Sequence, residues 1–281
     1  MEDKIFQQLS ELARALNNIA VKPIICGGLG IYLCFHKSEG EASRMIRATK
    51  DIDLILTEQD ILEQSKSRAI ADVITKKLEY TVREDSKYFR FEKASEQQLD
   101  ILTPLVPALK QKGNRTRIVK SVLHGRIMEE ACYIEEDLRV ITISDLLADS
   151  KKGNAFEIWV PSPSNMLIMK LFAFDDRCSG SRQDEERAQA HALDVFIIVM
   201  LSDRDDYIEG QEFLSRHNDS QIIKRARLIV ANKFSSIDKQ GWLTVLEATG
   251  FFPNLNVQQK RRLLEQAGQR LLRWFNVPKK D

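Results

Sequence analysis

Apolar side chains recur in short runs along the first 155 residues, and polar stretches separate these runs. Residues 3–20 place their apolar positions at helical spacing. The apolar run 24–26 ends in a double glycine, which indicates a strand, a tight turn and then a helix. The pattern predicts helices at 3–20, 29–35 and 58–79, strands at 24–26, 51–56, 88–91, 98–102, 117–123 and 138–143, and a polar loop at 36–50.

The pattern changes after Trp159, where two prolines flank Ser162. Serine is a favourable N-cap, and Pro163 suits the first position of a helix. The fold class is therefore α+β, with a mixed-sheet N-terminal domain at 1–155 and a C-terminal helical domain at 156–281. We expect the second domain to contain helices at 163–175, 184–201, 205–215, 219–234, 239–248 and 257–274.

Composition narrows the class of protein without pointing to a function. Apolar residues make up 43% of the chain and charged residues 30%, as in an ordinary globular protein. The four cysteines have neither CxxC pairing nor zinc-ligand spacing, which indicates free thiols in a reducing cytosol. No apolar run approaches the roughly 18–20 residues of a membrane span, and the N-terminus has no signal core. We expect a cytoplasmic protein with no membrane partner.

Charge is distributed unevenly along the chain. The net charge is +1, from 42 basic and 41 acidic residues, yet residues 221–281 contain 12 basic residues against four acids. This basic tail is either a contact surface for a polyanion or a solvated helical face. Trp274 and Phe275, beside Arg270 and Arg273, are either core residues or stacking contacts for RNA.

Asp51 and Asp53 form a candidate metal site on a predicted strand. Residues two apart in a strand point to the same face, with side chains about 6–7 Å apart. Neighbouring carboxylates repel each other, and a divalent cation such as Mg²⁺ relieves that repulsion while it also binds substrate phosphates. The alternative is a surface acid pair; the apolar neighbours Ile52 and Leu54 favour a strand that enters the core.

Gly27 and Gly28 stand between the strand predicted at 24–26 and the helix predicted at 29–35. Glycine lets the backbone approach a ligand closely, and a helix N-terminus directs its free N–H groups at an anion. The double glycine therefore indicates a phosphate site, with a tight turn that binds no ligand as the alternative.

Asp100 is a single acid inside the apolar strand 98–102. Burial of a lone carboxylate is unfavourable, so this residue must face a cleft, pair with a base or bind a metal. In phosphoryl chemistry such a carboxylate can act as a base near the attacking hydroxyl, or as a ligand of a second metal ion.

The order of these pieces resembles the polymerase-β-type nucleotidyltransferase superfamily: a double glycine, a helix, Asp-x-Asp on a strand and a single Asp on a later strand. The string Arg47-Ala48-Thr49-Lys50-Asp51-Ile52-Asp53-Leu54 is similar to the R-x-T-x-D-I-D-L motif of the AbiEii/AbiGii toxin-like group. The helical half agrees with two further motifs of the group. One leads from Val160-Pro161-Ser162-Pro163 to Lys170, Ala173 and Arg177, and the other runs from Arg187 to Asp194.

The resemblance implies a role for each candidate residue. Mg²⁺ or Mn²⁺ would be the cofactor, and an NTP would be the substrate. The implied site consists of Gly27, Gly28 and Thr49 at the triphosphate, Asp51 and Asp53 at the metal, Asp100 at a second metal or as the base, Lys170 at a phosphate, and Asp194, which would orient Lys170 or the acceptor.

Two positions differ from the family pattern. Gly28 stands where the common superfamily form has a serine, so a hydroxyl contact to phosphate is absent, and Ala190-His191 stands where many relatives have a lysine. Without the resemblance, Lys170 would be interpreted as a snorkelling lysine on an apolar helix. Arg187 would by default pair with a nearby acid such as Asp184.

The leading hypothesis is transfer of a nucleoside monophosphate from an NTP to a hydroxyl acceptor, with release of pyrophosphate. The group resemblance implies the toxin of a type IV toxin–antitoxin pair, with an antitoxin protein as partner and an RNA, such as the 3′ end of tRNA, as acceptor. One alternative is an aminoglycoside-like small molecule or a protein as acceptor. A nucleotide-binding regulator without turnover is the other.

Overall fold

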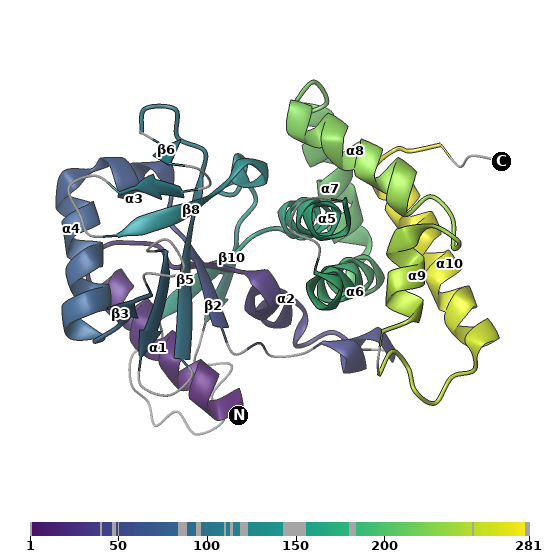
Figure 1. Cartoon of the computed structure of the whole chain (residues 1–281), viewed down its shortest axis with the longest axis horizontal. Helices are drawn as coiled ribbons and strands as arrows, with labels where there is room; N and C mark the ends of the chain where they lie inside the picture. Colours follow the sequence, from purple (N-terminus) through teal and green to yellow (C-terminus); the bar gives the residue numbers. More distant parts are fainter. Residues whose placement is uncertain are drawn as a thin grey trace. The chain divides into compact units, whose positions relative to one another are not determined.

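The chain forms two compact units in its computed structural model (Figure 1). Unit 1 comprises Met1–Cys34 and Arg47–Ser162, and unit 2 comprises Phe35–Ile46 and Pro163–Asp281. The structure describes residues 2–39, 41–46, 49, 51–83, 89–93, 97–109, 111–112, 115–118, 123–142, 156–179, 184–248 and 250–278.

In the part of the chain that the structure describes, unit 1 contains a ten-stranded mixed sheet and the helices that cover it. Its helical elements are α1 (Glu2–Asn17), α2 (Gly27–Phe35), α3 (Glu58–Leu62), α4 (Gln64–Asp72), the π-helical turn η2 (Val73–Lys77) and the 3₁₀ turn η4 (Glu129–Ala131). Its strands are β1 (Ile24–Cys26), β2 (Asp51–Ile55), β3 (Thr81–Val82), β4 (Arg90–Lys93), β5 (Gln97–Pro104), β6 (Gln111–Lys112), β7 (Arg115–Arg117), β8 (His124–Met128), β9 (Arg139–Thr142) and β10 (Glu157–Val160).

The strand order places the candidate motifs near the middle of this sheet. The order is β6-β7-β8-β5-β2-β1-β10-β9, and β4 also pairs with β5. β2 is parallel to β5 and antiparallel to β1, so the Asp-x-Asp strand lies between the glycine strand and the strand of Asp100. β8 is parallel to β5, and β4 is antiparallel to it.

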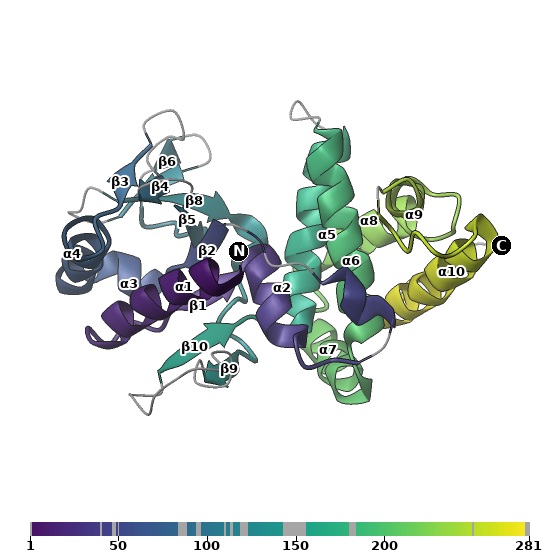
Figure 2. The same ribbon diagram turned by 90° about the horizontal axis from the view of Figure 1, so that it is seen from below.

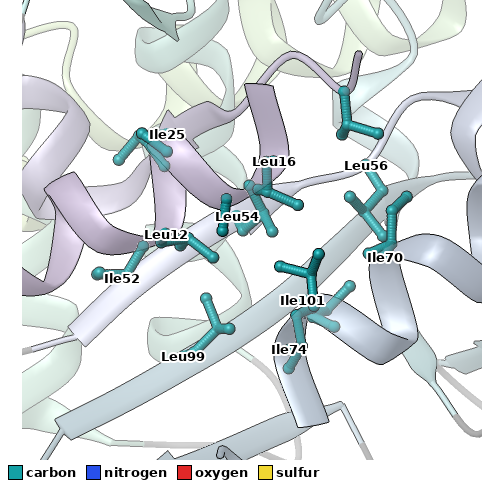
Figure 3. Packing of buried hydrophobic residues seen from close by; sticks show 14 of the residues in the cluster. Leu12, Leu16, Ile25, Ile52, Leu54, Leu56, Ile70, Ile74, Leu99 and Ile101 are labelled. Carbon is teal, nitrogen blue, oxygen red and sulfur yellow. The ribbon is translucent and has the colours of Figure 1, made fainter. Parts of the chain in front are cut away.

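One face of the sheet packs against α1, α4 and η2 to form the core of unit 1 (Figure 3). Ile52 and Leu54 on β2 and Leu99 and Ile101 on β5 are fully buried on this face. Side chains alternate between the faces of a strand, so Asp51, Asp53 and Asp100 point to the opposite face. Leu12 and Leu16 of α1 and Ile70 and Ile74 from α4 and η2 complete the cluster.

Unit 2 is helical, and α5 and α6 lie side by side in it (Figures 1 and 2). α5 begins at Pro163, as the Ser162-Pro163 pair predicts. Capping boxes at Asp203 and Asn256 satisfy free N–H groups at the starts of two later helices. The helical elements of unit 2 are η1 (Glu41–Met45), α5 (Pro163–Ser179), α6 (Glu185–Leu201), α7 (Arg204–Arg216), α8 (Gln221–Lys233), α9 (Gln240–Leu246) and α10 (Val257–Trp274).

The expected α+β class is confirmed, but several elements differ from the sequence interpretation. The single helix expected at 58–79 is α3, α4 and η2, because Glu63 is extended, with φ −74° and ψ 113°. The polar loop expected at 36–50 contains η1. β10 was not predicted, since its four residues directly precede the proline-rich start of α5.

The strand expected at 117–123 is wrong over its described residues except Arg117, where β7 ends: Ile118 and Leu123 lie outside strands, and β8 begins at His124. Residues 119–122 lie outside the described residues, as do Arg47, Ala48 and Lys50 of the motif at 47–54. Among the residues that the structure describes, no helix is both long and apolar enough to span a lipid bilayer.

Candidate active site

The glycine turn between β1 and α2 is pressed against the Asp-x-Asp strand. Gly27 has a φ of +67°, in the left-handed region that favours glycine. A Cβ atom placed on Gly27 would lie 1.9 Å from Oδ2 of Asp53, and one on Gly28 would lie 2.3 Å from Cγ2 of Thr49. The absence of both side chains therefore brings the N-terminus of α2 against two of the predicted site residues.

The three predicted carboxylates share one face of two neighbouring strands. Asp53 on β2 is the register partner of Asp100 on β5 and, on its other side, of Cys26 on β1. Asp51 and Asp53 are partly exposed, whereas Asp100 is only 4% exposed. The sheet thus brings Asp51, Asp53 and Asp100 together on the face opposite the core.

Arg90 also belongs to this cluster, although the sequence interpretation did not include it. It is the register partner of Asp100 on β4. Its Nε donates to Oδ1 of Asp100 at 2.7 Å, and its Nη2 donates to Oδ2 at 2.6 Å. These hydrogen bonds raise the pKa of Arg90, and the charge of Asp51 raises it further. A bidentate pair of this kind holds both oxygens of the Asp100 carboxylate in place.

The donor atoms of the cluster match a hard cation, with one restriction. Mg²⁺ accepts oxygen ligands and is commonly held by one or two carboxylates together with substrate phosphates, which Asp51 and Asp53 can satisfy. Both oxygens of Asp100 are already hydrogen-bonded to Arg90. Within the described part of the chain, no three His, Cys, Asp or Glu side chains are arranged as a ready-made metal site. The Asp51 and Asp53 carboxylates fit a metal, and Asp100 could be a third ligand only through a lone pair that Arg90 does not occupy.

Lys170 and Asp194 form a buried ion pair between α5 and α6 in unit 2. Nζ of Lys170 lies 2.6 Å from Oδ2 of Asp194, and the side chains are 10% and 8% exposed. The snorkelling interpretation of Lys170 is therefore wrong, because its ammonium group is buried and paired. The carboxylates discussed above belong to unit 1.

Several charged groups outside these clusters have structural partners. The predicted pairing of Arg187 is confirmed: its Nε lies 3.3 Å from Oδ2 of Asp184, the N-cap of α6. In the basic tail, Arg227 donates to the carbonyl of Phe275 at 3.1 Å, and Arg270 donates to the carbonyl of Met200 at 3.1 Å. These arginines cap helix C-termini.

Trp274 and Phe275 are core residues, with exposed fractions of 1% and 0%. The indole N–H of Trp274 donates to Oγ of Ser164 at 3.1 Å. Neither ring is open to a nucleobase, so the stacking interpretation of these two residues is wrong.

Comparisons with known proteins give one weak structural match. No protein-family model and no curated protein matches the chain. One solved structure is similar, that of the antibiotic-resistance factor ANT(2'')-Ia, at 13% identity and a TM-score of 0.38, over 78% of this chain and 99% of that one. At this level of similarity the comparison assigns neither fold nor activity.

Proposed function

We propose that the chain is a metal-dependent nucleotidyltransferase, which transfers a nucleoside monophosphate from an NTP to a hydroxyl acceptor and releases pyrophosphate. The observation that carries the proposal is the approach of Gly27 to Asp53, where a Cβ would lie 1.9 Å from Oδ2. A helix N-terminus favours an anion, whereas a carboxylate repels one. A triphosphate that carries a divalent cation would be compatible with both groups, because the charge of the cation would offset the repulsion between phosphate and carboxylate.

The residues of unit 1 then have distinct tasks. Gly27, Gly28 and Thr49 bind the triphosphate at the start of α2, and Asp51 and Asp53 hold Mg²⁺ or Mn²⁺. The bound ion would neutralise charge that develops on the phosphates during transfer. Positioning and electrostatics provide the catalysis, without a covalent enzyme intermediate.

Asp100 is the candidate base in this scheme. The acceptor oxygen bonds to the α-phosphorus, the bond from that phosphorus to the bridging oxygen of the β-phosphate breaks, and the hydroxyl proton moves to Asp100. A carboxylate has about four lone-pair sites, so Asp100 can accept a hydrogen bond from the acceptor while Arg90 occupies two of them. Arg90 is thus a positioning residue for the base.

Lys170 provides a further phosphate contact in this proposal, and Asp194 orients it. A compact ammonium on a long stem suits a point contact to phosphate. The ion pair at 2.6 Å supports the orienting role of Asp194. The division of the chain into a catalytic domain at 1–155 and a helical domain at 156–281 is part of the same proposal.

For the acceptor we propose an RNA, such as the 3′ end of tRNA, and for the biology the toxin of a toxin–antitoxin pair with an antitoxin protein as partner. The support is the motif resemblance at 47–54, together with the intact carboxylates Asp51, Asp53 and Asp100. The intact carboxylates also weigh against a regulator without turnover, since loss of turnover removes the need for them.

The proposed function can be tested by incubating purified protein with Mg²⁺ and each NTP in turn, radiolabelled at the α-phosphate. Total RNA, an aminoglycoside mixture and a protein lysate are offered as acceptors in separate reactions. Label on RNA supports the proposed acceptor, and label on either of the other two corrects the acceptor but keeps the chemistry. No label on any acceptor with any NTP contradicts nucleotidyl transfer.

A further inference from the structure

Four basic residues lie together on β7 and β8, at one end of the sheet of unit 1. In the antiparallel register Arg115 pairs with Arg126, and Arg117 pairs with His124. Register partners point to the same face of a sheet, so the four side chains share one face. This group, Arg115, Arg117, His124 and Arg126, is called the basic strip below.

The basic strip lies on the same face of the sheet as the carboxylates. Arg126 is the register partner of Leu102, which is two residues after Asp100 on β5. The intervening positions face the core: Thr116 and Gly125 are buried, and a Cβ on Gly125 would lie 2.2 Å from the side chain of Thr103. Arg117 is exposed, and the other three members of the strip are partly exposed.

The strip concentrates positive charge on two short strands. Like charges placed directly opposite each other across a strand pair are destabilising. Burial lowers the pKa of His124, and the neighbouring charges of Arg115 and Arg117 lower it further. The strip is therefore a concentration of basic side chains on the face of the sheet that carries the carboxylates, and a polyanion complements such a surface.

The strand order determines on which side of the candidate active site the basic strip lies. Across the sheet come the glycine turn after β1, Asp51 and Asp53 on β2, and Asp100 on β5, with Arg90 of β4 beside it. β8 pairs with β5 farther along, at Leu102–Pro104, and β7 follows β8. An in-line displacement places the leaving pyrophosphate and the attacking hydroxyl on opposite sides of the α-phosphorus. With the triphosphate at the glycine turn and the base at Asp100, β8 and β7 lie on the acceptor side.

We propose that the basic strip binds the phosphodiester backbone of an RNA acceptor and so presents its terminal hydroxyl to Asp100. This inference rests on the proposed function and assigns a binding surface to the RNA acceptor that it names. Neighbouring strands are about 4.8 Å apart, so the strip lies two to three strand spacings, roughly 10–14 Å, from Asp53. It is thus positioned for the backbone that leads to the acceptor end, rather than for the triphosphate.

A cationic small molecule does not match this surface. An acceptor that carries several amino groups would be repelled by three arginines on the acceptor side of the sheet. The strip therefore favours RNA over an aminoglycoside-like acceptor, on evidence independent of the motif resemblance.

RNA binding by the full chain tests the strip without any requirement for turnover. Fluorescence anisotropy of a labelled single-stranded RNA is measured over a range of salt concentrations. The strip variant is Arg115→Gln/Arg117→Gln/Arg126→Gln. The matched control, Lys260→Gln/Arg262→Gln/Arg273→Gln, removes three basic residues from α10 in unit 2.

We expect the strip variant to bind RNA at least about 10-fold more weakly near 0.15 M salt. In a plot of the logarithm of the binding constant against the logarithm of the salt concentration, the slope of the strip variant should be less steep by about 2. Each contact to a phosphate of a single strand contributes roughly 0.7 to this slope, and the variant removes three arginines. The control should bind within about 2-fold of the parental protein. NTP affinity in Mg²⁺ should be the same in all three proteins.

Unchanged RNA binding by the strip variant overturns the inference, as does an equal loss in the control. A parallel loss of NTP affinity also overturns it, because the strip would then serve the triphosphate. Parental protein that binds RNA through the strip but transfers no nucleotide supports the strip and contradicts the proposed function. If the triple variant does not fold, Arg117→Gln alone at its exposed position is expected to weaken RNA binding about 3-fold, and no change overturns the inference.

Discussion

At the scale of single residues, the backbone of Gly27 has a φ of +67° and lies against the carboxylate of Asp53. A side chain at this position meets two obstacles: backbone strain, and a clash with a residue that the site needs in place. Gly250 meets only the first, because its φ is +84° and a Cβ there would meet nothing within 4 Å. A comparison of alanine substitutions at these two glycines therefore distinguishes the effect of backbone strain from the effect of displacing Asp53.

We expect Gly27→Ala to lower the free energy of unfolding by about 2–3 kcal/mol and to reduce nucleotide transfer at least about 100-fold. Gly250→Ala should cost about 1 kcal/mol and leave transfer within about 2-fold. Urea unfolding and initial rates of label transfer measure both effects. Equal rates for the two variants would contradict the proposed role of the turn at Asp53.

Arg90 and Asp100 form a charge pair in which Asp100 is buried and Arg90 is partly exposed. Loss of Arg90 leaves a carboxylate that is only 4% exposed without its guanidinium. We expect Arg90→Gln to reduce the free energy of unfolding by about 3 kcal/mol and to lower kcat more than it raises KM for the NTP. Arg90→Lys should restore part of kcat, since it keeps the charge but not the paired hydrogen bonds.

Arg83→Gln is the control for Arg90→Gln. Arg83 also pairs with an acid, Glu92, at 2.8 Å, but the two side chains are largely exposed, at 39% for Arg83 and 46% for Glu92. An exposed pair contributes about 0–1 kcal/mol, so this variant should unfold almost as the parental protein does. If Arg90→Gln unfolds with the same small change and keeps its kcat, Arg90 does not position Asp100.

At the scale of helices and strands, α5 and α6 are joined by the pair of Lys170 and Asp194. We expect Lys170→Met and Asp194→Asn each to reduce the free energy of unfolding by about 3–5 kcal/mol. The double variant should lose less than the sum of the two, since it leaves neither charge buried alone. Additive losses in urea unfolding would show that the two residues are not coupled.

The elements differ in how far the sequence predicts them. α6 and α10 were expected at 184–201 and 257–274 and lie at Glu185–Leu201 and Val257–Trp274, because their apolar faces repeat over several turns and a cap stands before each. β10 has four residues and no alternation long enough to predict, and its stability comes from pairing with β1 and β9.

For the candidate site, too, the sequence predicts some residues and not others. The sequence alone singles out Gly27, Gly28, Asp51, Asp53 and Asp100 as candidates, because each residue type is unusual at its place in the local pattern. Arg90 and the basic strip were missed, because their importance depends on which strands are neighbours and in what register. That information is absent from local periodicity.

At the scale of the whole molecule, charge is divided between two units. Part of the basic tail caps helix ends within unit 2, through Arg227 and Arg270. The strip adds three arginines to the unit that contains the carboxylates. In the proposed scheme the anionic nucleotide and the anionic acceptor each need positive charge: a metal ion at Asp51 and Asp53 would supply it at the nucleotide, and the basic strip would supply it at the acceptor.

Nucleotide binding should therefore stabilise the chain only when a divalent cation is present. With Mg²⁺ and NTP at about 100 times Kd, mass action raises the free energy of unfolding by about 2.7 kcal/mol. Scanning fluorimetry should show a rise in Tm with NTP and Mg²⁺ together, and no rise with NTP in EDTA. An equal rise in EDTA would contradict the role of Asp51 and Asp53 as metal ligands.

The measurement that tests the central claim most directly compares the parental protein with Asp53→Asn in one transfer reaction. NTP labelled at the α-phosphate and NTP labelled at the γ-phosphate are supplied in parallel, with Mg²⁺ and RNA, and pyrophosphate is quantified. Asp72→Asn is the control, since Asp72 is exposed and paired with Lys76.

The parental protein and Asp72→Asn are predicted to transfer the α-label but not the γ-label, with one pyrophosphate released per nucleotide transferred. Asp53→Asn is predicted to lose at least about 100-fold in rate while it keeps its thermal unfolding temperature. Transfer of the γ-label, or transfer of the α-label that is unchanged in Asp53→Asn, would contradict a nucleotidyltransferase site at Asp51, Asp53 and Asp100.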